Sequence, residues 1–254
     1  MMTTRQIQAF KDLHVSGNPL VLYNIWDAGT AKIVADAGAK AIATGSASVA
    51  GAHGYPDGEK LPLGAALRNL KRVIDAVDIP VSIDLEGGYG AEPQTVADTV
   101  MRAVDLGAAG FNLEDQVVGA GALYGIPEQA ARIAAARKAL DGAGVPAFIN
   151  ARTDVFLQAG SNIQIDVLLD EVIQRAQAYN QAGADGLFVP GLIDAAAIKT
   201  LCEISPMPVN IMMGPNCPDA ETLAKQGVAR ISYGPGPYAS AMEAVAKQAK
   251  AVYS

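Results

Sequence analysis

A helical segment that ends at a glycine close to alanine and leads directly into a short apolar run recurs four times in this chain. Glycine just past the end of a helix accepts the left-handed backbone conformation that stops the helix. Four joints of one kind indicate a repeated βα unit. The joints are Asp36–Lys40 into Ala41–Thr44, Leu106–Gly110 into Phe111–Leu113, Gln181–Gly186 into Leu187–Val189, and Gln226–Arg230 into Ile231–Tyr233.

Apolar runs of strand length alternate with helical patterns along the whole chain. Strands that are apolar throughout indicate a parallel sheet covered on both faces. Eight βα units in 254 residues fit a closed (β/α)8 TIM barrel better than an open doubly wound sheet, so we predict one α/β barrel domain over residues 1–254. Strands are expected near 20–26, 41–46, 80–86, 110–114, 146–152, 186–190, 208–213 and 230–233, and helices near 3–15, 28–38, 63–77, 93–107, 127–142, 164–182, 194–202, 218–226 and 237–252.

Two glycine-bearing loops are long for connections between a strand and the next helix, which commonly have about 2–6 residues. One spans residues 47–61 after the second predicted strand, and the other spans residues 116–126 after the fourth. Long loops at the active rim of a barrel are candidates for lids that close over a substrate.

Acidic and amide side chains cluster near the carboxyl ends of the third, fourth and fifth predicted strands, which is where parallel β/α proteins carry their chemistry. Because strand side chains alternate, one set should point into the barrel while Ile83, Leu85, Leu113 and Ala151 pack outward against helices. Carboxylates are costly to bury together without a cation, so we expect bound Mg²⁺, with Mn²⁺ as the alternative. The inward set is Asp84, Glu86, Asn112, Glu114, Asn150, Arg152 and Asp154.

Several of these positions have two interpretations. The guanidinium of Arg152 could bind the carboxylate of an anionic substrate, or it could pair with Glu114. The backbone amides of Gly45 and Ser46 could hold an anion, but ordinary turn chemistry explains them nearly as well. Asp115 fits a helix cap or a loop position better than a metal ligand.

The acid or base of the reaction is harder to find in the sequence. Tyr55, Tyr124, Tyr233 and His53 are the open candidates for proton transfer. Trp26 and Tyr89 could line the pocket, although core packing explains Trp26 about as well. No lysine lies in a predicted strand, which disfavours a Schiff-base mechanism.

Composition narrows the class of partner. The net charge is -7, which argues against nucleic acid because phosphate binding needs clustered lysine and arginine. No apolar run is long enough to predict a membrane span, and residues 1–11 lack the apolar core of a signal peptide. Cys202 and Cys217 do not have the spacing of a metal site, so we expect reduced thiols in a cytoplasmic protein that acts on a small molecule.

Seven short pieces of sequence occur in an order that is specific as a set. On these pieces the chain resembles the isocitrate lyase/phosphoenolpyruvate mutase superfamily over nearly its whole length, and it is most similar to the 2-methylisocitrate lyase and phosphoenolpyruvate phosphonomutase subgroup. The pieces are Asn24–Asp27, Thr44–Ser46, Tyr55–Asp57, Asp84–Gly90, Leu113–Gln116, Asn150–Asp154 and Asn210–Gly214.

The resemblance implies a barrel whose C-terminal helix is exchanged between the subunits of a dimer, within a tetramer. It implies that Asp84 ligates Mg²⁺ while Asp57, Glu86 and Glu114 hold the waters of the ion. It also implies substrate binding by the amides of Gly45 and Ser46 and by Arg152. Trp26, Tyr89 and Asn210 complete the predicted substrate site, and the catalytic candidates are Arg152, Asp57, Tyr124 and Tyr233.

Two features depart from the pattern of this superfamily. Its lyases usually carry a Lys-Lys/Arg-Cys-Gly-His motif in the loop after the fourth strand, with the cysteine in proton transfer, and its phosphonate-processing members use a lysine there. The corresponding loop here, Gln116–Gly125, contains no lysine, cysteine or histidine. The Asp-x-Asp of many relatives is Asp84-Leu85-Glu86, with a longer second carboxylate.

Our leading hypothesis is therefore a Mg²⁺-dependent carbon–carbon lyase that resembles isocitrate or methylisocitrate lyase. It would act through a metal-stabilised enolate on a small carboxylate that contains or generates a 2-oxo acid. The alternatives are a phosphoenolpyruvate phosphonomutase or phosphonopyruvate hydrolase, an oxaloacetate decarboxylase, and a barrel that binds a 2-oxo acid without turnover.

Overall fold

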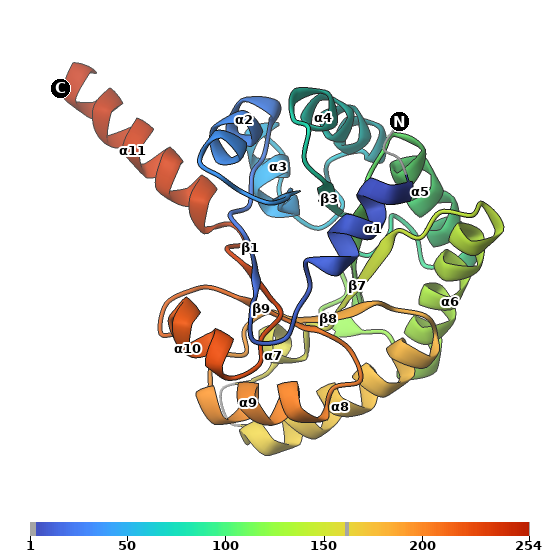
Figure 1. The fold of residues 1–254 in the computed structure, drawn as a ribbon. Coiled ribbons are helices and arrows are strands. Elements are labelled where there is room, and N and C mark those ends of the chain that lie inside the picture. Colours follow the sequence, from blue (N-terminus) through green and yellow to red (C-terminus); the bar gives the residue numbers. More distant parts are fainter. Residues whose placement is uncertain (1–3, 161–162, 254) are drawn as a thin grey trace.

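Eight short parallel strands form one sheet in this computed structural model, which describes residues 4–160 and 163–253 (Figure 1). Each strand lies where the sequence predicts one, although several are shorter than predicted. Neighbouring strands follow the order β1-β10-β9-β8-β7-β4-β3-β2. Their bounds are β1 Leu20–Leu22, β2 Ile42–Ala43, β3 Val81–Asp84, β4 Gly110–Glu114, β7 Phe148–Arg152, β8 Gly186–Val189, β9 Val209–Met212 and β10 Arg230–Ser232.

A parallel bridge between Ile25 and Thr44 brings the two ends of this sheet together, because it joins the chain just after β1 to the end of β2. The amide of Ile25 donates to the carbonyl of Ala43 at 2.9 Å, and the amide of Gly45 donates to the carbonyl of Ile25 at 3.3 Å. The sheet thus forms a nearly closed barrel, which confirms the predicted (β/α)8 architecture.

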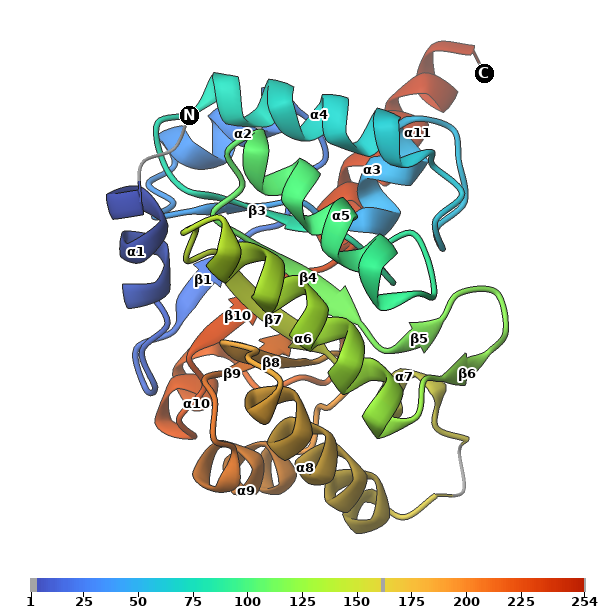
Figure 2. The same cartoon turned by 90° about the vertical axis from the view of Figure 1, so that its right-hand side faces the viewer.

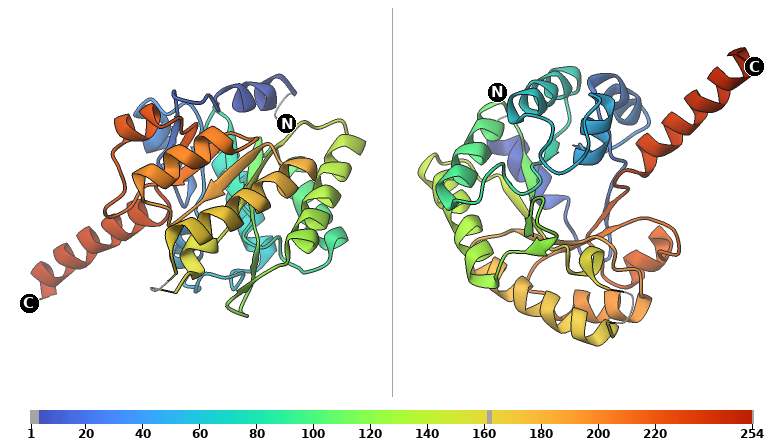
Figure 3. Two further views of the ribbon diagram at one scale, coloured as in Figure 1. Left: turned by 90° about the horizontal axis from the view of Figure 1, so that it is seen from below. Right: turned by 180° about the vertical axis from the view of Figure 1, so that it is seen from behind.

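Helices surround the barrel, as the view from behind in Figure 3 shows. The outer layer consists of α2 Ala28–Asp36, α4 Leu63–Ala76, α5 Pro93–Asp105, α6 Ile126–Gly142, α8 Ile165–Gln181, α9 Ala195–Ile204 and α10 Ala220–Lys225. α1, Thr4–Asp12, precedes β1, and the C-terminal α11, Gly236–Tyr253, projects away from the barrel (Figure 1). Among the described helices, none combines the length and the apolar character needed to cross a membrane.

The four repeated glycines have the backbone conformation that the joints require. Gly38, Gly107, Gly183 and Gly227 follow α2, α5, α8 and α10, and their φ angles are 97°, 108°, 97° and 93°. A side chain at such an angle is strained, so glycine ends each helix and allows the next strand to begin within a few residues.

The two expected lid loops are more ordered than glycine content alone predicts. Residues Ser46–Ala52 form α3, so the prediction of a loop over all of 47–61 was wrong in its first half. Small residues and Val49 pack this helix onto the barrel, since Ser48, Val49 and Ala50 are buried. The second loop contains a two-stranded antiparallel hairpin, β5 Gln116–Val117 with β6 Ala122–Leu123, which extends beyond the end of β4 in Figure 2. A further short helix, α7 Val155–Gln158, was not predicted.

The predicted alternation of strand side chains is also confirmed. Ile83, Leu85, Leu113 and Ala151 are buried in the main hydrophobic cluster together with apolar residues of the surrounding helices. The inward face is polar: Asn150 Nδ2 donates to Asn112 Oδ1 at 2.9 Å and to Asn210 Oδ1 at 3.2 Å. Hydrogen bonding among these amides offsets the cost of burying them inside the barrel.

His14 lies buried beneath the barrel in an apolar setting. Its ring stacks on Phe148 at 4.0 Å and meets the edge of Phe10 at 4.9 Å, and its Nδ1 lies 2.9 Å from the carbonyl oxygen of Phe10. Burial, with a smaller contribution from the charge of Arg230, lowers the pKa of His14 from 6.5 to about 3. The folded protein therefore holds His14 neutral, whereas the unfolded chain protonates it below about pH 6.5.

Acidification should consequently destabilise the fold through His14. Between its two pKa values the unfolded state binds one more proton, so the free energy of unfolding should fall by about 1.4 kcal/mol per pH unit as the pH drops below 6.5. Denaturant titrations between pH 7 and pH 4.5 measure the free energy of unfolding at each pH. Its slope against pH should differ between the wild type and His14→Phe by this amount. His53→Gln, which alters the other histidine, should keep the wild-type slope. Equal slopes for wild type and His14→Phe would contradict the assignment.

Candidate active site

A cavity of about 260 Å³ opens at the carboxyl ends of the strands, where β/α barrels hold their active sites. All eight strands of the barrel or the segments that follow them contribute residues to it, together with α7 and the first lid loop. Its size suits a small ligand. The lining residues are Asn24, Gly45, Ser46, Ala47, Ser48, Asp57, Asp84, Asn112, Arg152, Leu157, Phe188, Pro190, Met212, Ser232, Gly234 and Pro235.

Two carboxylates, those of Asp84 and Asp57, line this cavity. Asp84 ends β3 with its side chain 8% exposed, and its Oδ2 accepts the amide of Ser46 at 3.3 Å. Asp57 reaches the cavity from the first lid loop. Burial, followed by repulsion from Asp84, raises the pKa of Asp57, while Ser46 and Arg152 oppose that rise. An acid whose ionisation is opposed by a neighbouring carboxylate makes the site favourable for a cation.

Arg152 connects these acids to a second pair of carboxylates. Its Nη1 lies 2.9 Å from Glu114 Oε2 and 3.9 Å from Asp84 Oδ2, and its Nε and Nη2 donate to the two oxygens of Asp154 at 2.6 and 2.8 Å. Burial alone would lower the pKa of Arg152, but Glu114, Asp154 and Asp84 raise it. The predicted pairing with Glu114 is thus present, and Arg152 also lines the cavity.

Glu114 has the strongest tendency of this group to hold a proton. It is 4% exposed, and burial raises its pKa to about 9, against the opposing effect of Arg152. The remaining acids Asp154, Asp84 and Glu86 add to the rise. One arginine therefore compensates this set of buried carboxylates only in part.

The donor chemistry fits Mg²⁺ held largely through water. Within residues 4–160 and 163–253, no three or more His, Cys, Asp or Glu side chains are grouped closely enough to bind an ion directly. Mg²⁺ commonly keeps several waters and takes one or two carboxylates from the protein. The arrangement of Asp84 with Asp57 and Glu114 nearby fits this way of binding Mg²⁺. A dication among these acids would offset the negative charge that Arg152 leaves unbalanced.

Glu86 lies beyond the end of β3 and has a φ of 51°, so it leaves the strand alternation. Its Oε2 accepts the amides of Gly58 and Glu59 from the first lid loop at 2.8 and 2.6 Å. Burial raises the pKa of Glu86 to about 7, while the Glu59 amide opposes the rise. One oxygen of this predicted metal-associated acid is therefore engaged by protein backbone.

Of the predicted substrate-binding residues, Gly45, Ser46 and Arg152 line the cavity. The Gly45 amide is used by the bridge that closes the barrel, and the Ser46 amide points at Asp84. Trp26 packs in a satellite cluster with Val49 and meets Tyr238 at 5.2 Å, away from the cavity lining. Asn210 belongs to the buried amide network below the cavity. Tyr89 lines a small hollow beside Glu86.

None of the four candidates for proton transfer is part of the described cavity lining. Tyr124 places its ring 4.1 Å from the guanidinium of Arg132. Tyr233 packs against Tyr23 at 5.2 Å. Tyr55 is exposed, and His53 Nδ1 lies 2.9 Å from the carbonyl oxygen of Val49.

Other parts of the site were not found from the sequence. Apolar residues of α7, β8, β9 and the segments after β8 and β10 form a wall of the cavity: Leu157, Phe188, Pro190, Met212 and Pro235. Phe188 and Met212 had a signal in their inward parity, Phe188 with Arg152 on the neighbouring strand and Met212 with Asn210 on its own strand. Asp115 is not a helix cap: it is fully buried, and its Oδ2 accepts from Arg175 Nη1 at 3.0 Å and from the Tyr179 hydroxyl at 2.8 Å. Arg175 lies sixty positions away in the chain, beyond the reach of local pattern reading.

Comparison with known proteins gives a consistent family. The sequence model of the family described as Phosphoenolpyruvate phosphomutase matches residues 10–253. 2-Methylisocitrate lyase of Escherichia coli (strain K12) is 32% identical over 212 residues, which cover 80% of this chain and 68% of that protein. A candidate phosphonomutase of Burkholderia cenocepacia J2315 has a solved structure with 50% identity and a TM-score of 0.94, covering 97% of this chain and 98% of its own.

The same fold occurs in a phosphonopyruvate hydrolase that was solved in complex with oxalate and Mg²⁺, with a TM-score of 0.82 at 22% identity and coverage of 97% of this chain and 85% of that one. The family match extends over almost the entire sequence and includes every strand of the barrel. The chain therefore belongs to the phosphoenolpyruvate mutase/isocitrate lyase superfamily.

Proposed function

We propose that this protein is a Mg²⁺-dependent lyase that breaks a carbon–carbon bond in a small carboxylate that contains or generates a 2-oxo acid. The observation that carries this proposal is the convergence of Asp57, Asp84 and the Arg152–Glu114 pair on one small cavity at the carboxyl end of the barrel. Burying the side chains of Asp84 and Glu114 together has no structural benefit of its own, which supports a role in holding a cation.

Each residue of the site has a distinct task in this proposal. Asp84 would hold the ion directly, with Asp57, Glu86 and Glu114 bearing on its waters. Bound Mg²⁺ would act as a Lewis acid that stabilises the negative charge developing as the bond breaks. Arg152 would orient the carboxylate of the substrate with the N–H groups that Glu114 and Asp154 leave free. We assign proton transfer to Asp57, because it lines the cavity and the tyrosine and histidine candidates do not.

Phosphonate chemistry is the second candidate, as a phosphoenolpyruvate phosphonomutase or phosphonopyruvate hydrolase. The 50% identity to a candidate phosphonomutase favours it. The charge of the site opposes it: among the described residues that line the cavity, Arg152 is the single cation, and it already serves several carboxylates. A phosphonate that also carries a carboxylate brings more negative charge than this arginine and one dication balance comfortably.

Substrate turnover distinguishes these reactions. The protein would be incubated with Mg²⁺ or Mn²⁺ and, in turn, isocitrate, 2-methylisocitrate, malate-type acids, oxaloacetate and phosphonopyruvate, with products followed by proton and phosphorus NMR. We expect a 2-oxo acid and a second carboxylate from one of the hydroxy acids, and no product after addition of EDTA. Carbon dioxide from oxaloacetate alone would indicate a decarboxylase. Calorimetric binding of a 2-oxo acid without any product would contradict an enzymatic role.

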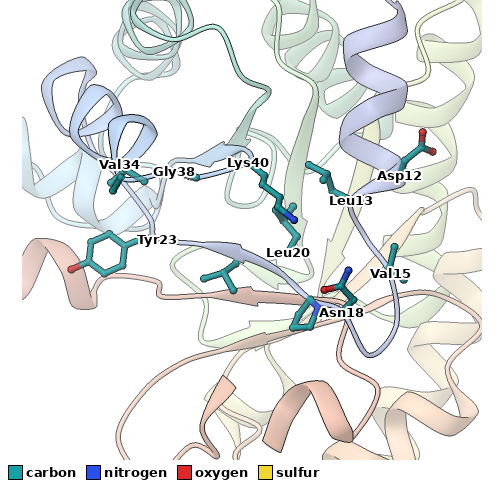
Figure 4. A pocket seen from close by; sticks show the side chains of 13 residues that line it. Asp12, Leu13, Val15, Asn18, Leu20, Tyr23, Val34, Gly38 and Lys40 are labelled. Carbon is teal, nitrogen blue, oxygen red and sulfur yellow. The ribbon is translucent and has the colours of Figure 1, made fainter. Parts of the chain in front are cut away.

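We further infer that the chain forms a dimer or tetramer by exchanging α11. This helix extends away from the barrel (Figure 3). Its residues Met242, Val245 and Val252 have exposed side chains. A groove of about 470 Å³ lies open along the outer side of β1, between the end of α1 and α2, and includes the exposed Val21 and Tyr23. Figure 4 shows Tyr23 and Val34 on one side of this groove and Leu13 and Val15 on the other. Apolar surface on both parts is better buried by a second copy.

Light scattering tests this assembly. Val245→Asp should shift the wild-type dimer or tetramer towards monomer, because it places a charge in the apolar surface of α11. Lys247→Ala, a substitution at another position of the same helix, should leave the mass unchanged. A monomeric wild type at micromolar concentration would contradict the inference.

A further inference from the structure

Two glutamates join the loop that carries Asp57 to the turn that follows β3. Glu86 Oε2 accepts the amides of Gly58 and Glu59 at 2.8 and 2.6 Å. In return, Glu59 Oε1 accepts the amide of Tyr89 at 2.7 Å. Each carboxylate therefore satisfies backbone donors of the segment that carries the other. We call this set of three hydrogen bonds the glutamate clasp.

The backbone of the clasp is strained. Glu59, Glu86 and Tyr89 have φ angles of 56°, 51° and 59°, and Asn216 is the one other non-glycine residue with positive φ in the described parts of the chain. Such conformations are unfavourable for a residue that carries a side chain and persist only where surrounding contacts enforce them. The clasp supplies those contacts, since its hydrogen bonds involve all three strained residues.

The turn that receives Glu59 is also anchored from its other side. Arg132, which is 1% exposed, donates through Nη2 to the carbonyl of Gly87 and, at 3.0 Å, to that of Gly90. A side chain at Gly87 would lie 3.0 Å from both Glu59 Oε1 and Val118 Cγ2, so the second lid loop packs on the same point. The turn at 87–90 is thus a fixed support to which the loop of Asp57 is tied.

We propose that Glu59 is a positioning residue for Asp57. Asp57 is followed directly by the two amides that Glu86 binds, and the Glu59 side chain ties the same loop to the supported turn. Together these contacts hold the Asp57 carboxylate at the cavity beside Asp84.

The same contacts explain why residue 86 is a glutamate. An aspartate side chain is shorter by about 1.5 Å, one carbon–carbon bond, and would leave the amides of Gly58 and Glu59 beyond hydrogen-bonding distance.

Hydrogen exchange of the full-length protein tests the clasp without any substrate. In Glu59→Ala, amides in 57–61 and 87–91 should exchange about tenfold faster than in the wild type, because the acceptor that ties them is gone. Glu59→Gln keeps an acceptor oxygen at the same reach and should exchange near the wild-type rate. Lys60→Ala, an exposed neighbour in the same loop, should not differ from the wild type. Peptides from β7 report whether the barrel stays folded.

A second readout measures the consequence at the cavity. The dissociation constant for Mn²⁺, measured by calorimetry, should rise several-fold in Glu59→Ala and stay unchanged in Glu59→Gln and Lys60→Ala. If Glu59→Ala also loosens β7, Glu59→Asp replaces it, and its shorter side chain should release the same two segments. Wild-type exchange in Glu59→Ala, or equal acceleration by Glu59→Gln or Lys60→Ala, would overturn the proposal. The role of Asp57 and the Mn²⁺ readout rest on the proposed function, whereas the exchange readout tests the clasp itself and holds whichever reaction the protein catalyses.

Discussion

Replacing Arg152 by methionine should lower the free energy of unfolding by about 3–5 kcal/mol, because it leaves buried carboxylates without their cation. Arg152 contacts Glu114 and both oxygens of Asp154, and it lies 3.9 Å from Asp84. The side chains of these three acids are only 2–8% exposed, so water cannot replace the lost charge. Urea titration of the metal-free protein, followed through its single tryptophan, measures the loss.

Two control variants separate charge from shape. Arg152→Lys keeps the positive charge but cannot bind Asp154 through two donors, so it should cost clearly less than methionine. Arg68→Met removes an exposed arginine of α4 and should change stability by no more than about 0.5 kcal/mol. All variants need the same protein concentration, since subunit association shifts apparent stability. An Arg152→Met protein as stable as Arg68→Met would show that the acids are compensated by something else.

Replacing Asp84 by asparagine should abolish turnover while leaving the fold intact. Asp84 is the acid that we assign to direct contact with Mg²⁺, and loss of its charge should lower kcat/KM by at least about 10³-fold. Binding of Mn²⁺ should weaken strongly in the same variant. Stability of the metal-free protein should stay the same or increase, because Asp84 repels Asp57, and Arg152, which is already engaged by Glu114 and Asp154, compensates Asp84 only in part.

A loss of activity and of Mn²⁺ binding without a loss of stability distinguishes a functional acid from a structural one. Asp98→Asn, on the exposed face of α5, is the matched control and should keep both activity and Mn²⁺ binding. Calorimetry gives the dissociation constant for Mn²⁺, and urea unfolding of the same samples gives the free energy of unfolding. A large loss of stability in Asp84→Asn with unchanged Mn²⁺ affinity would assign Asp84 to the scaffold instead.

Local sequence patterns were sufficient for the architecture and for the position of the acids. The glycine joints give rise to the βα repeat because their positive φ angles are a local backbone property. Alternation along β3, β4 and β7 separates inward polar residues from the outward Ile83, Leu113 and Ala151. Parallel strands place their carboxyl ends at one rim, so the sequence alone predicts Asp84 and Arg152 close together, and they lie 3.9 Å apart.

Side-chain partners could not be predicted in the same way. Asp115 looks like a loop residue in sequence, yet its partners Arg175 and Tyr179 come from α8. Tyr124 and Tyr233 looked like proton-transfer candidates, but Tyr124 lies against Arg132 and Tyr233 against Tyr23. Loop residues depend on long-range packing, and neither parity nor helical period constrains the direction of their side chains.

Local sequence alone is enough to predict the barrel, the rim that carries the chemistry and the excess of negative charge there. These features follow from backbone conformation and strand periodicity, which act over a few residues. Three features of the site emerge only in the folded molecule: Arg152 pairs with Glu114 and Asp154, Glu86 accepts the lid amides, and Leu157 and Met212 line the cavity. The physical reason is that such contacts join segments far apart in the chain, and their geometry exists only once the strands have closed around a common interior.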